Sequence, residues 1–187
     1  MKRVLVPLAP GFEEIEAITI IDVLRRAGVT VEVAGTEPGP ITGSHGITVT
    51  PDRPLAGADA GAYDLVALPG GMPGTLHLRE HADVRRIVRE LASRGCYTTA
   101  ICAAPTVLAA AGVTAGRAVT SHPSVAAELA QAGITYRTDA VVADGPVITS
   151  RGAGTAIEFA LTLVATLVDR PTAERLRQQM VVPAAAL

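Results

Sequence analysis

The feature that most constrains the fold of this sequence is a regular alternation of short apolar runs with helical stretches. The first run, Arg3 to Ala9 (RVLVPLA), is rich in β-branched residues and is typical of a strand buried on both faces. A helical stretch with acids near its start follows, and it closes on Arg25-Arg26-Ala27-Gly28, as the helix dipole and C-cap rules favour. Strand and helix in alternation predict a mostly parallel sheet covered by helices on both faces.

The same alternation continues to the end of the chain. Further strands are expected at residues 29–34, 47–50 (an edge strand or hairpin), 63–68, 96–101, 117–121, 141–143 and 147–149. Helices are expected at residues 84–92, 103–111, 124–133, 156–168 and 172–180. We therefore predict one doubly wound, three-layer α/β domain over residues 1–187.

The composition excludes several classes of protein. With 49% hydrophobic residues and a net charge of −2, the chain is too apolar for a disordered protein and has no charge footprint for nucleic acid or a membrane surface. Its apolar runs are broken well before the roughly 18 residues that span a bilayer, and its N-terminus lacks a signal-peptide pattern. Two cysteines cannot form a secreted disulfide framework. We expect a cytoplasmic enzyme-sized domain.

Cys102 lies directly after the strand expected at 96–101 and before an Ala-rich helix. The small residues Ala100 and Ala104 flank it, which is the layout of a nucleophile elbow, a crowded turn in which larger neighbours would clash. The positive end of the following helix is expected to favour the thiolate form. The alternative is a buried cysteine that acts only as a small hydrophobic residue.

Cys96 is expected to have a different role. It precedes Cys102 by six residues on the same strand, which places it roughly 20 Å away at about 3.3 Å per residue. That span excludes a disulfide between the two cysteines. We interpret Cys96, at the opposite end of the sheet, as a structural residue.

Glu16 shares a helical stripe with the apolar residues Phe12, Ile20 and Val23. Burial in such company would raise the pKa of its carboxyl, so that it could donate a hydrogen bond near neutral pH. The alternative is an acid in the first helical turn that only complements the helix dipole.

Two further segments follow strands at the same end of the predicted sheet, where ligands bind in doubly wound folds. The turn at residues 69–74 (PGGMPG) can direct backbone N–H groups at an oxyanion, or it is only a connecting loop with convenient glycines. His122 can act as a base or orienter, or it is a hydrogen-bonded loop residue. His45, His77 and His81 have no metal-binding spacing with each other or with the cysteines, so we expect neither a metal nor a cofactor.

Four short motifs occur in one order: Gly11–Glu16 (GFEEIE), Leu68–Gly71 (LPGG), Ala100–Pro105 (AICAAP) and Ser150–Thr155 (SRGAGT). Through them the chain resembles the ThiJ/PfpI superfamily, in the branch of the human parkinsonism-associated deglycase and bacterial YajL. The resemblance spans nearly the whole chain, from Val4 to about Val168. It implies a flavodoxin-like fold and a homodimer.

The resemblance also implies roles for individual residues. Cys102 would be the oxidisable nucleophile, and Glu16 its protonated partner. Gly70 and Gly71, with Ala103, would supply backbone donors beside the sulfur. His122 would be the nearby histidine, and Arg151 would contribute to an anion-friendly surface.

Three differences from the sequence patterns of related proteins limit the activities that the resemblance implies. Ala103 stands where the protease branch of the superfamily carries a histidine, and the segment after His122 lacks the acid found in glutamine amidotransferases. His45 stands where the human relative has an arginine, so an anion site does not transfer directly to this chain.

The sequence therefore favours a cofactor-free thiol enzyme that acts on reactive carbonyl compounds. Its substrate would be methylglyoxal or glyoxal, as in glyoxalase III activity, or a glycated protein, as in deglycase activity. One alternative is an oxidative-stress sensor or chaperone that uses the oxidisable Cys102. A weaker alternative is a peptidase or amidase, which Ala103 disfavours.

Overall fold

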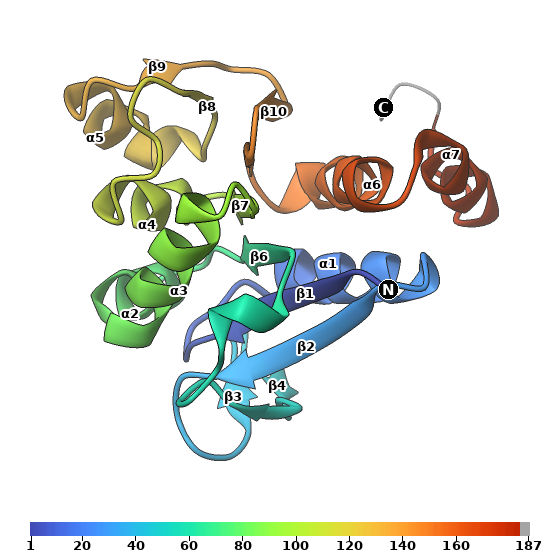
Figure 1. Cartoon of the computed structure of the whole chain (residues 1–187), viewed down its shortest axis with the longest axis horizontal. Coiled ribbons are helices and arrows are strands. Elements are labelled where there is room, and N and C mark those ends of the chain that lie inside the picture. Colours follow the sequence, from blue (N-terminus) through green and yellow to red (C-terminus); the bar gives the residue numbers. More distant parts are fainter. Residues whose placement is uncertain (184–187) are drawn as a thin grey trace.

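Figure 1 shows a computed structural model of the chain, which describes residues 1–183. The last four residues of the domain expected over 1–187 lie outside this range. The main sheet has seven strands in the order β10 (Val141–Asp144), β11 (Val147–Ser150), β7 (Tyr97–Ile101), β6 (Leu65–Leu68), β1 (Arg3–Leu8), β2 (Thr30–Gly35) and β5 (Arg53–Pro54). The strand pairs are parallel except β10 with β11, which is antiparallel.

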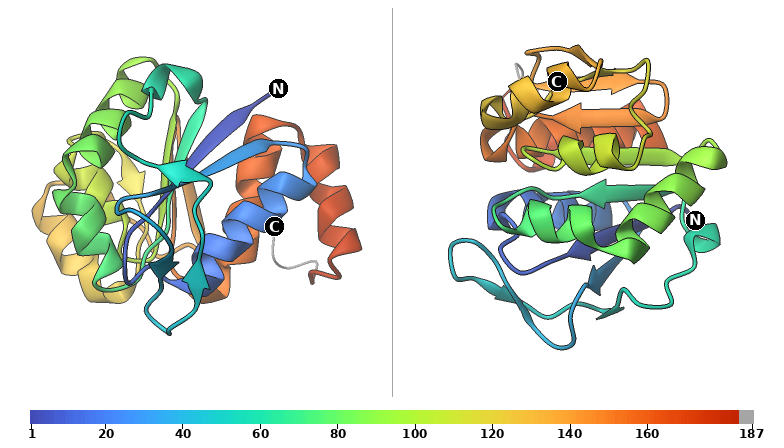
Figure 2. Two further views of the ribbon diagram at one scale, coloured as in Figure 1. Left: turned by 90° about the horizontal axis from the view of Figure 1, so that it is seen from below. Right: turned by 90° about the vertical axis from the view of Figure 1, so that its left-hand side faces the viewer.

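Helices cover both faces of this sheet, as the two views of Figure 2 show. One face packs against α1 (Glu14–Arg26), α6 (Ala156–Leu167) and α7 (Arg170–Gln179). The other face packs against α2 (Gly74–Glu80), α3 (Ala82–Ser93), α4 (Pro105–Ala110) and α5 (Ala126–Gln131). Because β6 and the part of β1 from Val4 to Leu8 are buried between the two layers, their sequences are continuous apolar runs. The predicted α/β, flavodoxin-like fold is confirmed.

The structure differs from the sequence expectations in several connections. Residues 47–50, expected as an edge strand or hairpin, contribute β4 (Thr48–Val49), which forms a small antiparallel hairpin with β3 (Ile41–Thr42). The two edge strands of the main sheet are β10 and the two-residue strand β5. The sequence does not predict helix α2, because the segment before it is rich in glycine and proline and is typical of a loop. The helix is short, and its Leu78 is fully buried. A second small sheet pairs β8 (Ala118–Val119) with β9 (Thr135–Tyr136).

The chain order places a topological switch point beside β1. Helix α1 leads from β1 to β2 on one face, whereas α2 and α3 connect β6 to β7 on the other face. Loops that follow β1, β6 and β7 therefore meet at one end of the sheet, where doubly wound folds bind ligands. Among the helices that the structure describes, none is long and apolar enough to cross a membrane.

Candidate active site

Cys102 lies in the turn between β7 and α4, with a backbone φ of 64°. This left-handed conformation is uncommon for any residue but glycine. Two backbone hydrogen bonds hold it: the Cys102 N–H donates to Ser150 O at 3.0 Å, and the His122 N–H donates to Cys102 O at 2.8 Å. Neighbouring segments thus fix the strained turn that the sequence predicts as a nucleophile elbow.

Gly70 is packed so closely against the elbow that no side chain fits. A Cβ atom there would lie 2.6 Å from Cys102 Cβ and 2.8 Å from Glu16 Oε2. Its N–H donates to Glu16 Oε2 at 2.8 Å. This corrects the expectation that Gly70 offers a donor beside the sulfur, because the buried carboxyl of Glu16 takes up that N–H.

The N–H groups of Gly71 and Ala103 favour the thiolate and act to lower the pKa of Cys102. Burial is nevertheless the largest influence on the thiol and, together with the charge of Glu16, raises the pKa of Cys102 to about 12. The sequence expectation that the following helix favours the thiolate is therefore wrong for the state with Glu16 ionised. Helix α4 has only six residues, and its N-terminus does not outweigh the burial and the neighbouring charge.

Glu16 lies in the first turn of α1, and its side chain is fully buried. Burial raises the pKa of its carboxyl to about 7, against the opposing hydrogen bonds from the Gly70 N–H and Cys102. Its Oε1 has no hydrogen-bond partner among the described residues. An ionised Glu16 repels a thiolate on Cys102, whereas a protonated Glu16 can donate to one, so the proton on Glu16 controls the ionisation of the thiol.

Cys102 and Glu16 open onto a cavity of about 580 Å³ at this end of the sheet. The cavity is lined by Glu13, Glu14, Ile15, Glu16, His45, Ile47, Cys102, His122 and Ala153. Neither lysine nor arginine occurs among these described lining residues. The cavity is therefore built from apolar surface, carboxyl groups and two imidazoles around a single thiol.

His122 joins Cys102 at this cavity, as the sequence predicts. The side chain is exposed, and its Nδ1 lies 2.8 Å from Ser124 Oγ and accepts from the Ser124 N–H at 3.2 Å. Because Nδ1 accepts a hydrogen bond from the Ser124 N–H, the neutral ring carries its proton on Nε2. The structure thus brings His122 near the thiol, while its catalytic role stays a prediction.

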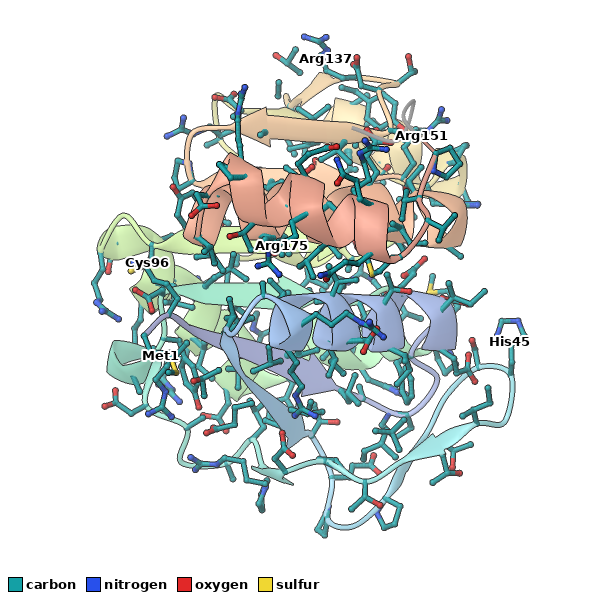
Figure 3. All side chains as sticks on the ribbon, turned by 90° about the vertical axis from the view of Figure 1, so that its right-hand side faces the viewer. Met1, His45, Cys96, Arg137, Arg151 and Arg175 are labelled. Atoms are coloured by element: carbon teal, nitrogen blue, oxygen red, sulfur yellow. The ribbon has the colours of Figure 1, made fainter. Side chains whose placement is uncertain are left out.

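Arg151 lines a neighbouring cavity of about 360 Å³ that shares His122 and Ala153 with the Cys102 cavity. Its Nη1 donates to Thr138 O at 3.2 Å. Figure 3 shows Arg151 and His45 near one end of the molecule and Cys96 at the other. Arg151 is therefore adjacent to the thiol cavity without lining it, and Cys96 is remote from both.

Sequence reasoning places the acidic residues that follow β1 at this end of the sheet, but it does not predict that they meet His45 at the cavity. Glu13, Glu14 and His45 each place one possible ligand atom within 4.8 Å of the others. The spacing of histidines and cysteines does not reveal this group, because the β3–β4 hairpin brings His45 to Glu14, which lies 31 residues earlier in the chain. The only sequence signal is the turn-forming segment Gly43 to Gly46 (GSHG).

Comparisons with known proteins identify the family of the chain and agree with its fold. The model of the DJ-1/PfpI family matches residues 2–166. Protein dj-1beta of Drosophila melanogaster is 43% identical over 183 residues, which are 97% of each chain. The crystal structure of Drosophila melanogaster DJ-1beta superposes with a TM-score of 0.93 at 42% identity, over 97% of this chain and 98% of that one.

Two other similar proteins carry informative names. A Caenorhabditis elegans protein named glutathione-independent glyoxalase DJR-1.2 is 40% identical over 167 residues, which are 89% of each chain. The structure described as Toxoplasma gondii DJ-1, oxidized, has a TM-score of 0.92 at 34% identity, over 97% of this chain and 98% of that one.

Proposed function

The chain belongs to the DJ-1/PfpI family, and from this premise we propose that it is a cofactor-independent cysteine enzyme acting on reactive dicarbonyl compounds in the cytoplasm. The observation that carries the proposal is the buried carboxyl of Glu16 beside the Cys102 thiol, on a strained elbow that faces a cavity. The glyoxalase name of the Caenorhabditis elegans relative supports the same reaction class.

The reaction begins when Cys102 transfers its proton to ionised Glu16 and the sulfur adds to the aldehyde carbon of methylglyoxal. A C–S bond forms as the carbonyl π bond breaks, and the carbonyl oxygen becomes an oxyanion, which the Gly71 and Ala103 N–H groups beside Cys102 can stabilise. Glu16, with a pKa of about 7, is matched to return a proton to that oxygen.

The resulting hemithioacetal then rearranges without any external oxidant. A proton moves from C1 to a base, and the C2 carbonyl oxygen gains a proton, which gives an enediol. C2 then gains a proton and the C1 hydroxyl loses one, so that the enediol becomes a lactoyl thioester on Cys102. Water cleaves the C–S bond to release lactate and restore the thiol. Glu16 and His122 are the cavity groups that can carry these protons.

The chemical character of the cavity supports small uncharged carbonyl substrates. Three glutamates line it, and Arg151 lies in the adjoining cavity. An early glycation adduct on a protein carries the same reactive carbon, so deglycation is the related activity to compare.

We also propose that the chain forms a homodimer. Ile15 and Ile18 on α1 and Ile157 on α6 are large apolar side chains with 58%, 44% and 43% exposure. Helices α1 and α6 pack against each other, so the three side chains belong to neighbouring surfaces that a second copy can cover.

The decisive experiment measures lactate formation from methylglyoxal without glutathione. We expect Cys102→Ser to abolish turnover and the matched Cys96→Ser variant to retain it, because Cys96 lies at the far end of the molecule. Assays with glycated peptide and an amide substrate run in parallel would separate direct deglycation and peptidase activity. Unchanged methylglyoxal turnover in Cys102→Ser would contradict the proposed enzyme.

A second candidate function is peroxide sensing by the same thiol. The N–H groups of Gly71 and Ala103 and a protonated Glu16 can stabilise a sulfinate, which forms when the Cys102 sulfur takes two oxygens from two peroxide molecules and releases water. The oxidised Toxoplasma gondii DJ-1 structure supports this chemistry in a similar protein. Mass spectrometry after mild peroxide should find two added oxygens on Cys102 before any on Cys96; equal oxidation of both would contradict a tuned sensor.

A further inference from the structure

The loop between β3 and β4, residues 43–47, folds around one buried carboxyl group. Glu14 Oε1 accepts from the His45 N–H at 2.6 Å and from the Ile47 N–H at 3.3 Å. Glu14 Oε2 accepts from Ser44 Oγ at 3.3 Å and lies 2.9 Å from His45 Nδ1. Four groups of one short loop thus converge on a single side chain.

The fit of the loop against this carboxyl is close. A Cβ atom on Gly43 would lie 2.4 Å from Glu14 Oε1, so the loop reaches the carboxyl only because residue 43 has no side chain. The Glu14 side chain is 5% exposed, whereas the His45 side chain is 71% exposed. The loop therefore wraps the carboxyl from the solvent side.

Glu14 remains an anion in this environment. Burial alone would raise the pKa of its carboxyl, but the hydrogen bonds from the His45 side chain and from the loop N–H groups lower it to about 2. A permanent charge strengthens each of these hydrogen bonds relative to a neutral acceptor.

The same loop forms one wall of the Cys102 cavity. His45 and Ile47 line the cavity together with Cys102, and Ile47 has 56% of its surface exposed. Apart from the carboxyl, the loop is held to the helix entry by the Ser44 N–H, which donates to Phe12 O at 2.8 Å.

From these contacts we infer that Glu14 is a positioning residue, which holds the 43–47 loop as the substrate-contacting wall of the cavity without taking part in the chemistry at Cys102. This inference rests on the proposed function for its kinetic consequence, but the loop geometry can be measured without any turnover. Glu14 then affects KM, whereas kcat depends on Cys102 and Glu16.

Substitution by glutamine gives a pH signature that a general loss of stability would not produce. In Glu14→Gln one oxygen still accepts from the loop N–H groups, while the new amide nitrogen faces His45 Nδ1. A neutral His45 can accept from that amide, whereas a protonated His45 cannot. Glu13, with Oε1 4.0 Å from His45 Nδ1, is the other charged group facing the imidazole.

The test compares Glu14→Gln and Glu14→Ala with Glu37→Gln. Glu37 is an exposed acid in the preceding loop, and its substitution removes the same charge. Hydrogen exchange of the segment 43–47 should accelerate at least about tenfold in Glu14→Ala and remain unchanged in Glu37→Gln. With methylglyoxal, we expect KM to rise about five- to tenfold in Glu14→Ala, with kcat within about twofold. The KM defect of Glu14→Gln should shrink between pH 6 and pH 9, and that of Glu14→Ala should not.

Each outcome decides one question. Wild-type loop exchange in both Glu14 variants would overturn the inference even if turnover were lost. If the wild type does not turn over methylglyoxal, the proposed function fails, and loop exchange still decides the inference. If Glu14→Ala does not fold, the Glu14→Gln loop exchange and its pH dependence carry the test, and a pH-independent, wild-type-like result would overturn the inference.

Discussion

Glu14 and Glu16 lie two residues apart in the first turn of α1, and both are buried, yet their chemistry is opposite. The pKa of Glu14 is lowered to about 2, whereas the pKa of Glu16 is raised to about 7. The two side chains leave opposite sides of the same turn. Glu14 meets the 43–47 loop, and Glu16 meets Gly70 and Cys102.

The difference teaches that burial does not decide the charge of a carboxyl by itself. Several donors converge on Glu14, including two backbone N–H groups, and together they outweigh its burial. Glu16 has one backbone donor, and its Oε1 is without a partner among the described residues. One carboxyl is thus a fixed structural anion, and the other is a proton carrier.

The largest expected effect comes from removing the proton carrier. Glu16→Gln preserves the shape of the side chain but cannot exchange a proton, so methylglyoxal turnover should fall by about 100- to 10,000-fold. The loss should appear in kcat, measured as lactate release at saturating substrate. Glu14→Gln is the matched control, and equal kcat losses in both variants would remove the distinction between the two carboxyls.

The next effect is a pH dependence of stability with opposite sign for the two residues. Glu14 contributes stability above its unfolded pKa of 4.5, and this is lost as the pH falls toward 2. For Glu16 the sign is opposite. Its contribution to the free energy of unfolding is complete below pH 4.5 and is lost as the pH rises through about 7.

Urea unfolding of the wild type and Glu16→Gln measures this contribution. Between pH 4.5 and 7, the wild type should lose roughly 3 kcal/mol of unfolding free energy relative to Glu16→Gln, at about 1.4 kcal/mol per pH unit. A difference between the two proteins that stays constant over this range would show that Glu16 ionises normally in the folded chain.

The smallest expected effect comes from the negative charge of Glu13, Glu14 and Glu16, which line the cavity. The measurement is the ratio of two alkylation rates, that with the anion iodoacetate and that with neutral iodoacetamide. This ratio should be about tenfold lower at Cys102 than at Cys96, which serves as an internal reference. Glu13→Gln should reduce this discrimination by about twofold, because Glu13 lines the cavity. Equal reagent ratios at both cysteines would mean that the cavity does not select by charge.

The parts of this molecule that the sequence predicts are those fixed by local pattern. Buried strands such as Leu65–Leu68 are visible as apolar runs, and the flanking small residues identify Cys102. The apolar stripe around Glu16 correctly predicts its burial and raised pKa. Each of these properties depends on neighbours close in sequence or on the faces of one helix.

Properties that depend on distant segments could not be predicted. The N–H of Gly70 is taken by a carboxyl 54 residues earlier, and the environment of Glu14 is made by a hairpin about 30 residues later. The pKa of the thiol was expected in the wrong direction, because helix position is visible in sequence while burial and the charge of Glu16 are not. Long-range packing decides these properties.

The backbone of Cys102 has a consequence for the chain as a whole. A conformation that glycine adopts freely is occupied here by a residue with a side chain, at a cost of about 1–2 kcal/mol. Selection for a robust fold alone would favour glycine at this position. The molecule therefore trades folding stability for a thiol at the wall of the cavity, and a stabilising substitution at residue 102 would also remove the reactive group.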